Sequence, residues 1–181
     1  MRIIAGTWRG RRLLSPEGDR IRPTADRARE ALFGILEHGL PPLRDSRFLD
    51  LFCGTGAVGL EAASRGAAEV LLIDDDARAL RLARANLEQL GAPANVRLIP
   101  RDATRLGAAP ARYDLVFLDP PYRSGLATPA LSALRDGWLA AGARLVVELG
   151  AREGLDLPPG YAPEQERRYG AARFAFLRVA A

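Results

Sequence analysis

The chain has 181 residues, of which 48% are hydrophobic and 27% charged, proportions typical of one globular domain with a real core. Its single cysteine and single histidine exclude a disulfide framework or a zinc cluster within the chain, so we expect no metal. No apolar run approaches the ~20 residues of a membrane span, and the first residues lack the apolar core of a secretory signal, so we expect a cytoplasmic protein with no membrane partner.

The positive charge is concentrated at the beginning of the chain. The net charge is +4, and residues 1–30 hold eight arginines against four acids, so this segment alone accounts for it. All 26 basic residues are arginine. So complete a bias indicates the base composition of the source genome, so the number of arginines is not by itself evidence of function. A basic segment on a nearly neutral body favours a polyanionic partner, although a solvated arm would carry the same charge.

The first predicted elements are a hairpin and a helix. Residues 2–15, RIIAGTWRGRRLLS, are typical of two short strands about a turn at Arg9-Gly10. Pro23 then marks a boundary, and Thr24 can cap a helix that ends before Gly39. The apolar residues that share one face of this helix are Ala28, Ala31, Leu32, Ile35 and Leu36.

From residue 47 onward, apolar strands alternate with helices. Strands are predicted at 47–53, 69–74, 95–102, 113–119 and 143–150, and two more flank a glycine turn within 166–180. Helices are predicted at 60–66, 77–91 and 126–136. Because parallel strands need such crossovers, the fold class is α/β, with a doubly wound, Rossmann-like sheet of seven strands whose last strand is antiparallel.

A glycine-rich turn follows the first of these strands. Gly54, Gly56 and Gly59 are spaced as GxGxxG, and Asp74 follows 20 residues after Gly54, at the tip of the second strand. Glycines let a ligand approach main-chain N–H groups, and an acid at this distance binds the two hydroxyls of a ribose. The pattern predicts an adenosine-type ligand, and the alternative is a packing turn without one.

The same pattern also fits a nicotinamide-dinucleotide site, but two features argue against it. Asp50, four residues before Gly54, would repel a pyrophosphate and attract the ammonium of an amino-acid moiety. A dehydrogenase usually carries a second, substrate-binding domain as well, and the chain has no room for one.

A stiff corner, Asp119-Pro120-Pro121-Tyr122, ends the fourth strand. Ligands of open parallel sheets lie beyond this end of the strands, and we expect the corner next to strand one. Proline fixes φ and lacks an N–H, so the Asp119 carboxylate and the Pro120 carbonyl form two acceptors on a rigid frame. Two acceptors and the flat ring of Tyr122 suit a planar base with an exocyclic amine, oriented so that its lone pair attacks a methyl group. A plain strand-ending turn is the alternative.

These motifs resemble a known family. DLFCGTGAVGLEA together with DPPY is similar to the S-adenosylmethionine-dependent methyltransferases of nucleobase amines. With RIIAGTWRGRRL and RPTADRAREALFGIL in the same order, the chain resembles the small-subunit ribosomal RNA guanine-N2 methyltransferases, the RsmD family. The resemblance implies methylation of N2 of one guanine of 16S rRNA, in the 30S subunit or a protein-bound assembly intermediate. It implies one domain, 1–181, acting as a monomer, with 1–40 as a basic RNA-binding hairpin and helix and 41–181 as the catalytic core.

The resemblance also assigns residues. S-Adenosylmethionine would be held by Asp50, Phe52, Gly54, Gly56, Asp74, Asp75, Asp102, Ala103 and Asp119. The target guanine would be held by Asp119, Pro120, Pro121 and Tyr122. Within the cofactor set, Asp74 would bind the ribose where the family commonly has glutamate, and Asp102 would accept from the adenine amine. Asp102 could instead cap a helix ahead of Ala103.

The candidate RNA-binding residues are arginines and neighbours of the first 30 residues, with one more after the corner, and the resemblance itself implies Arg22 and Thr24. The candidates are Arg2, Trp8, Arg9, Arg11, Arg12, Arg22, Thr24, Arg27 and Arg123. Arginine binds phosphates, and Trp8 could stack on a base. Trp8 could equally pack against the body, and Arg22 and Thr24 could act only in helix capping.

Two other functions remain open from the residues. A DNA adenine-N6 methyltransferase can share DPPY, but such enzymes usually carry a target-recognition domain. A non-catalytic RNA-binding assembly factor could retain the fold, although the intact Asp119 and glycine turn argue against it.

Overall fold

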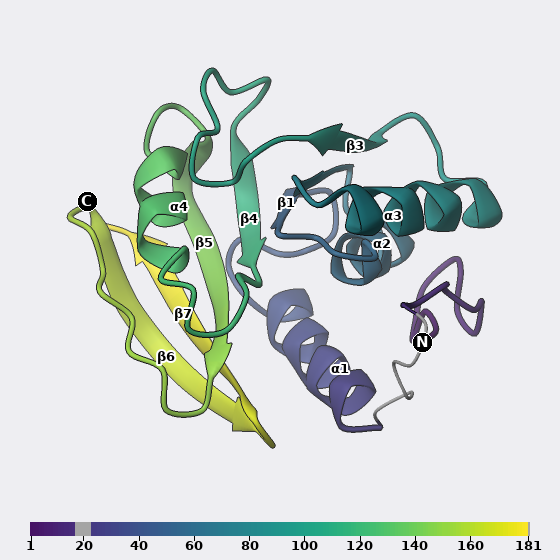
Figure 1. Ribbon diagram of the computed structural model, residues 1–181, viewed down its shortest axis with the longest axis horizontal. Helices are drawn as coiled ribbons and strands as arrows, with labels where there is room; N and C mark the ends of the chain where they lie inside the picture. Colours follow the sequence, from purple (N-terminus) through teal and green to yellow (C-terminus); the bar gives the residue numbers. More distant parts are fainter. Residues whose placement is uncertain (17–22, 181) are drawn as a thin grey trace.

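One mixed sheet of seven strands forms the centre of the molecule, in the order β3-β2-β1-β4-β5-β7-β6 (Figure 1). The computed structural model describes residues 1–16 and 23–180. The strands are β1 (Arg47–Leu51), β2 (Glu69–Asp74), β3 (Val96–Pro100), β4 (Tyr113–Leu118), β5 (Leu139–Gly150), β6 (Tyr161–Tyr169) and β7 (Ala172–Val179). Strands β1 to β5 are parallel, and β7 is antiparallel to both β5 and β6. The predicted seven-stranded α/β sheet with an antiparallel last strand is confirmed.

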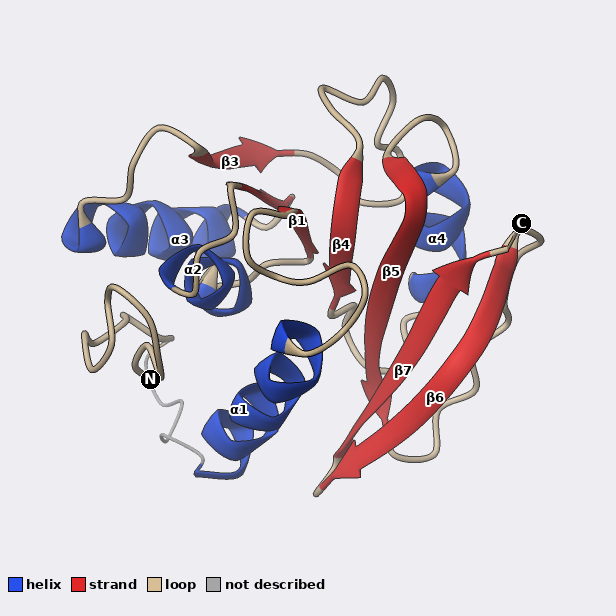
Figure 2. Ribbon diagram, turned by 180° about the vertical axis from the view of Figure 1, so that it is seen from behind, coloured by secondary structure: helices blue, strands red, loops and turns tan. Residues whose placement is uncertain are grey.

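Helices cover both faces of this sheet (Figure 2). They are α1 (Pro23–Glu37), α2 (Ala57–Ser64), α3 (Ala77–Leu90) and α4 (Ala127–Leu134). Side chains of α1, α2 and α3 pack with Phe48 and Phe117 on one face, and those of α4 pack with Leu49 and Leu118 on the other. Two covered faces explain why the parallel strands are almost continuously apolar. Among the helices of the described residues, none combines the length and apolar character that a membrane crossing requires.

Several element boundaries differ from the prediction: α2 begins at Ala57, three residues before the predicted 60, and β6 begins at Tyr161, five residues before 166. Two further differences have a clear physical cause. On α1, Phe33 is fully buried and stacks on Phe48 at 6.4 Å between ring centroids, whereas Ala31 and Ile35 stay partly exposed. Strand β5 begins four residues before the predicted 143, because it already pairs with Tyr113 at Leu139 and then crosses an irregularity in the register. Tertiary packing and pairing, which a local pattern does not contain, cause both differences.

The N-terminal segment turns back on itself as predicted, but neither of its two arms forms a strand. Its two arms share a single antiparallel bridge, between Arg2 and Arg12. The arms share backbone hydrogen bonds from the Ile3 N–H to the Arg11 carbonyl, at 2.9 Å, and from the Leu13 N–H to the Met1 carbonyl, at 3.0 Å. On α2, the buried carboxylate of Glu61 accepts from the backbone N–H groups of Ile4, at 2.8 Å, and Ala5, at 3.0 Å, so the segment packs on α2 and α3 (Figures 1 and 2).

Candidate active site

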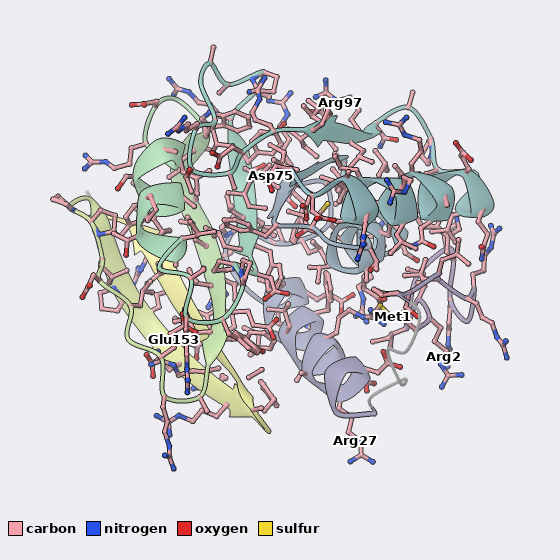
Figure 3. The ribbon with its side chains drawn as sticks, in the orientation of Figure 1. Met1, Arg2, Arg27, Asp75, Arg97 and Glu153 are labelled. Atoms are coloured by element: carbon pink, nitrogen blue, oxygen red, sulfur yellow. The ribbon has the colours of Figure 1, made fainter. Side chains whose placement is uncertain are left out.

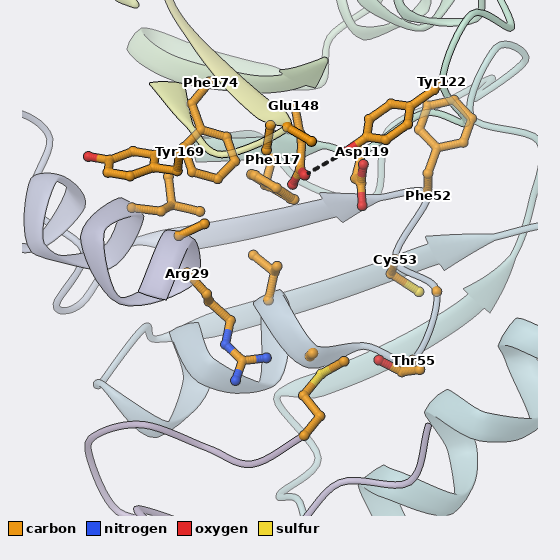
Figure 4. Close-up of a pocket in the computed structure, with 18 of the residues that line it drawn as sticks. Arg29, Phe52, Cys53, Thr55, Phe117, Asp119, Tyr122, Glu148, Tyr169 and Phe174 are labelled. Carbon is orange, nitrogen blue, oxygen red and sulfur yellow. Dashed lines mark hydrogen bonds between the residues drawn. The ribbon is translucent and has the colours of Figure 1, made fainter. Parts of the chain in front are cut away.

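The glycine turn and the stiff corner open onto one pocket. Strand β1 pairs with β4, with Leu51 opposite Leu118, so the segments that follow both strands leave the sheet at the same edge. There a cavity of about 500 Å³ has Gly54, Asp119 and Tyr122 among its lining residues (Figure 4). The structure therefore brings the two motifs together, as the sequence predicts.

The glycine turn combines an open position with a packed one. Gly54 has φ 56°, and a Cβ there would meet no atom within 4 Å, so the backbone is accessible to a ligand. Gly59 is different, because a Cβ there would lie 2.2 Å from a methyl group of Leu72. One glycine leaves room for a ligand, and the other lets α2 approach the sheet.

Asp74 joins the glycine turn to the tip of β2. Its Oδ2 accepts a hydrogen bond from the Gly54 N–H at 2.8 Å, and its Oδ1 accepts one from the Asp76 N–H at 2.9 Å. Each carboxylate oxygen has a second lone pair, so both can still accept from a pair of ribose hydroxyls. The predicted juxtaposition of acid and glycine turn is present.

Asp50 lies deeper than the sequence suggests. The sequence places it at the mouth of strand β1, but it is 1% exposed and its Oδ2 accepts from the Gly59 N–H at 2.8 Å. Burial raises the pKa of Asp50 to about 7, and the negative charge of Asp74 acts in the same direction, against the Gly59 hydrogen bond. Its carboxylate thus anchors the start of α2, and contact with a cofactor ammonium stays a prediction.

The remaining predicted cofactor residues lie around the same edge. Asp102 accepts from both the N–H and the hydroxyl of Thr104, at 2.8 and 2.7 Å, and these bonds lower its pKa. These hydrogen bonds resemble those of a helix cap, the alternative role of Asp102, although no helix follows them. Ala103 is buried, Asp75 is exposed after β2 (Figure 3), and Phe52 lines the pocket.

Three polar side chains form an acidic corner in the pocket: Asp119, Glu148 and Tyr122 (Figure 4). The Tyr122 hydroxyl donates to Glu148 Oε1 at 3.3 Å. Asp119 is exposed toward the pocket, but the surrounding protein still excludes much of the water from its carboxylate. Burial raises the pKa of Asp119 well above its ordinary value, and Glu148 and Asp50 raise it further. Burial also raises the pKa of Glu148, and burial with the neighbouring carboxylates raises that of Tyr122 to about 12.

The stiff corner is held by more than its prolines. Glu153 accepts from the Arg123 N–H at 2.9 Å and from the Gly150 N–H at 3.1 Å, which ties the corner to the end of β5. The Ser124 N–H closes a turn onto the Pro121 carbonyl at 3.1 Å. Pro120 is buried, whereas Tyr122 is 54% exposed, so its ring is available for stacking.

Sequence reasoning missed Glu148 and the far wall of the pocket. Glu148 had one signal, an acid inside the apolar run LVVELG. The far wall comes from Met1, from α1 with Arg29, and from the β6–β7 hairpin with Tyr169 and Phe174 (Figure 4). These residues are distant in sequence, and no local motif marks them.

The predicted RNA-binding residues fall into three groups. Those that are exposed are Arg2, Arg9, Arg12, Arg27 and Arg123 (Figure 3 labels Arg2 and Arg27). Arg11 is exposed as well, but its guanidinium donates to the carbonyls of Leu90, at 2.9 Å, and of Gln89 at the end of α3. Trp8 packs against the core. Arg22 and the side chain of Thr24 lie outside the described residues. A role in RNA binding stays a prediction for all of them.

The donor set fits an adenosine-type cofactor. An accessible backbone at Gly54, a carboxylate fixed beside it at Asp74 and a cavity next to both provide what a ribose and its substituent require. Among residues 1–16 and 23–180, no group of three or more His, Cys, Asp or Glu side chains is arranged to hold a metal ion.

Known proteins resemble this chain along its length. The model of the family described as conserved hypothetical protein 95 matches residues 1–178. The ribosomal RNA small subunit methyltransferase D of Escherichia coli K12 is 39% identical over 177 residues, which cover 96% of this chain and 87% of that protein. The solved Escherichia coli protein yhhF superposes with a TM-score of 0.85 at 38% identity, covering 100% of this chain and 98% of that one.

A more distant solved structure shares the fold alone. The magnesium protoporphyrin IX methyltransferase of Synechocystis, solved with bound S-adenosylmethionine, is 18% identical and superposes with a TM-score of 0.69 over 94% of this chain and 87% of that one.

Proposed function

The chain belongs to the conserved hypothetical protein 95 family, that of the ribosomal RNA small subunit methyltransferases D, and on that basis we propose that it methylates the N2 amine of one guanine in 16S rRNA. It is a methyltransferase dependent on S-adenosylmethionine. The observation that carries the proposal is the common cavity, whose walls include both Gly54 and Asp119.

S-Adenosylmethionine, when bound, supplies an electrophilic methyl group. Gly54 would expose its backbone to it, and the Asp74 carboxylate would accept from its ribose hydroxyls. Gly56 is buried, and a Cβ there would lie 3.1 Å from Leu72, so its part would be to shape the turn. Asp50 and Phe52 would border its amino-acid part, and the segments after β2 and β3 would border its adenine. The residues of those segments are Asp75, Asp102 and Ala103.

The stiff corner would hold the target base. The Asp119 carboxylate and the Pro120 carbonyl would accept the two amine hydrogens, which orients the nitrogen lone pair toward the methyl donor. The exposed ring of Tyr122 would stack on the guanine. A base inside an RNA must leave its stack to reach such a site, and a cavity of about 500 Å³ gives it a place. After transfer, the surplus amine proton would pass to the Asp119 carboxylate or to water.

The basic N-terminal segment would bind the RNA around that base. Met1 and Arg29 line the pocket, so residues 1–40 border the place where the base would enter. The exposed Arg2, Arg9 and Arg27 would contact phosphates. We propose that the enzyme acts as a monomer. We infer that the substrate is the 30S subunit or its assembly intermediate, and such a substrate would place the enzyme in the cytoplasm.

The test is transfer of a tritiated methyl group to 30S particles that lack this modification, followed by digestion and nucleoside analysis. We expect N2-methylguanosine, formed about 100- to 1000-fold more slowly by Asp119→Ala. N6-methyladenosine as the product would overturn the guanine assignment. Binding of the cofactor without transfer to particles or to free 16S rRNA would overturn the enzymatic role.

A further inference from the structure

A second carboxylate, that of Glu148, lies next to Asp119 and has no part in the proposed methyl transfer. Strands β4 and β5 are parallel with Leu118 opposite Val147, so Asp119 and Glu148 are the next two residues in register. Side chains of neighbouring positions in register point to the same face of a sheet. Both carboxylates line the same pocket (Figure 4).

Glu148 lacks the partners that a structural carboxylate needs. Its hydrogen-bond donor is the Tyr122 hydroxyl at 3.3 Å, whereas a carboxylate offers about four acceptor sites. Within the described part of the chain, no arginine pairs with it. A partly buried charge without partners is unfavourable, so its free acceptor sites are available to a ligand with N–H donors.

The neighbouring charged residues also favour a ligand that carries hydrogen-bond donors. Asp119 is also an acceptor, and Asp50 lies behind it on the same face of the sheet, opposite Phe117. Arg29 lines the far wall, but it is engaged by Asp26 at 3.1 Å and Glu61 at 3.9 Å. Burial raises the pKa values of both Asp119 and Glu148, and repulsion from Glu148 raises that of Asp119 further. A ligand with two adjacent N–H donors would stabilise the charged forms of both carboxylates.

Guanine carries such a pair of donors, and adenine does not. The N2 amine and the N1–H of guanine are adjacent donors on one edge, whereas adenine has a bare acceptor at N1 beside its amine. We propose that Glu148 accepts the N1–H of the target guanine while Asp119 accepts the N2 amine, so that Glu148 selects guanine over adenine. This inference rests on the proposed function and adds the residue that determines the base.

The experiment compares two bases at the methylated position. Once that position has been mapped with the wild type, 30S particles are reconstituted with guanine or with 2-aminopurine there. 2-Aminopurine keeps the amine but has an unprotonated N1. We expect the wild type to lose roughly ten- to a hundredfold in kcat/KM on 2-aminopurine, the discrimination of a good polar contact. Glu148→Gln, whose amide can donate to N1, should reduce that ratio at least about threefold.

A matched control is Glu153→Gln, which weakens the corner without facing the pocket and should lower both rates by the same factor. Cofactor affinity, measured by calorimetry, should stay unchanged in Glu148→Gln and so report intact folding. An unchanged ratio in Glu148→Gln, or equal wild-type rates on the two bases, would overturn the role of Glu148. A wild-type product other than N2-methylguanosine on unmodified particles would instead overturn the proposed function itself.

Discussion

Asp74 accepts a hydrogen bond of 2.8 Å from the backbone N–H of Gly54, which lies 20 residues earlier in the chain. This bond fixes the glycine turn over the tip of β2, so the turn and the acid form one binding unit. The position of the exposed backbone and the fixed negative charge therefore both depend on the Asp74 side chain. Replacing this side chain tests the cofactor site directly.

Replacing Asp74 with alanine should weaken S-adenosylmethionine binding by about 10- to 100-fold, the loss expected for hydrogen bonds to a charged group. Asp74→Asn should lose less, because it retains one acceptor for the Gly54 N–H. Calorimetry measures both. Asp76→Ala is the control, since it removes the cap of α3 and should lower the melting temperature while leaving the affinity nearly unchanged. Equal affinity losses at positions 74 and 76 would contradict the assignment.

Asp119→Ala should leave cofactor affinity intact and reduce methyl transfer by about 100- to 1000-fold, the usual effect of removing one group that stabilises a transition state. The physical reason is that Asp119 would accept from the amine of the base, whereas Gly54 and Asp74 would hold the cofactor. Single-turnover transfer to 30S particles, with calorimetry on the same preparation, separates the two effects. Turnover at the wild-type rate would remove Asp119 from the reaction.

Methyl transfer should fall in acid because the carboxylates of Asp119 and Glu148 both have raised pKa values. As the pH falls through those values, the pair takes up a proton and loses an acceptor for the base. In Glu148→Gln the negative neighbour that raises the pKa of Asp119 is absent, so the acid limb of the kcat/KM profile should move to lower pH. If the acid limb of the kcat/KM profile lies at the same pH in the wild type and in Glu148→Gln, the two carboxylates do not interact.

Asp50→Asn should stabilise the fold at neutral and alkaline pH. The pKa of an aspartate in water is 3.8, and that of Asp50 in the folded state is about 7, so the wild type loses stability as the pH rises from about 4 to about 7. Asparagine has no charge to bury and can still accept from Gly59. The gain is at most about 4 kcal/mol, at ~1.4 kcal/mol per pH unit. Urea unfolding should show it at pH 8 and not at pH 4, and an equal difference at both would refute it.

Gly6→Ala should destabilise the protein far more than Gly10→Ala. Both glycines have φ 81°, but a Cβ at Gly6 would lie 1.8 Å from the Ser64 carbonyl oxygen, whereas one at Gly10 would meet nothing within 4 Å. Gly10→Ala thus measures the strain of the positive φ alone, about 1 kcal/mol. Gly6→Ala should also release the N-terminal segment from α2, seen as faster proteolysis near residue 6. Similar melting temperatures for the two variants would refute this packing.

The sequence predicted those parts of the molecule that depend on local patterns. Alternating strands and helices indicated the sheet, and the spacing from Gly54 to Asp74 indicated their contact. The far wall of the pocket could not be predicted, because Met1, Arg29 and Phe174 meet only after the whole sheet has formed. The packing of the N-terminal segment could not be predicted for a similar reason, since Glu61, which binds the backbone of Ile4 and Ala5, lies more than fifty residues away.

Asp50 is a single residue whose role could be predicted only in part from the sequence. Its place four residues before Gly54 marked it as part of the site, but only the structure reveals that α2 uses its carboxylate. Glu148 was overlooked because an acid in an apolar strand carries no motif. Its meaning comes from its neighbour in register on β4.

The position of β7 between β5 and β6 also constrains how the protein matures during translation. A ribosome delivers β6 before the strand that must separate it from β5, so β5 waits with an open edge until residues 172–179 have emerged. An open edge invites pairing with other chains. The wall that carries Tyr169 and Phe174 therefore cannot be complete before residues 172–179 have emerged, and neither can the pocket that it lines.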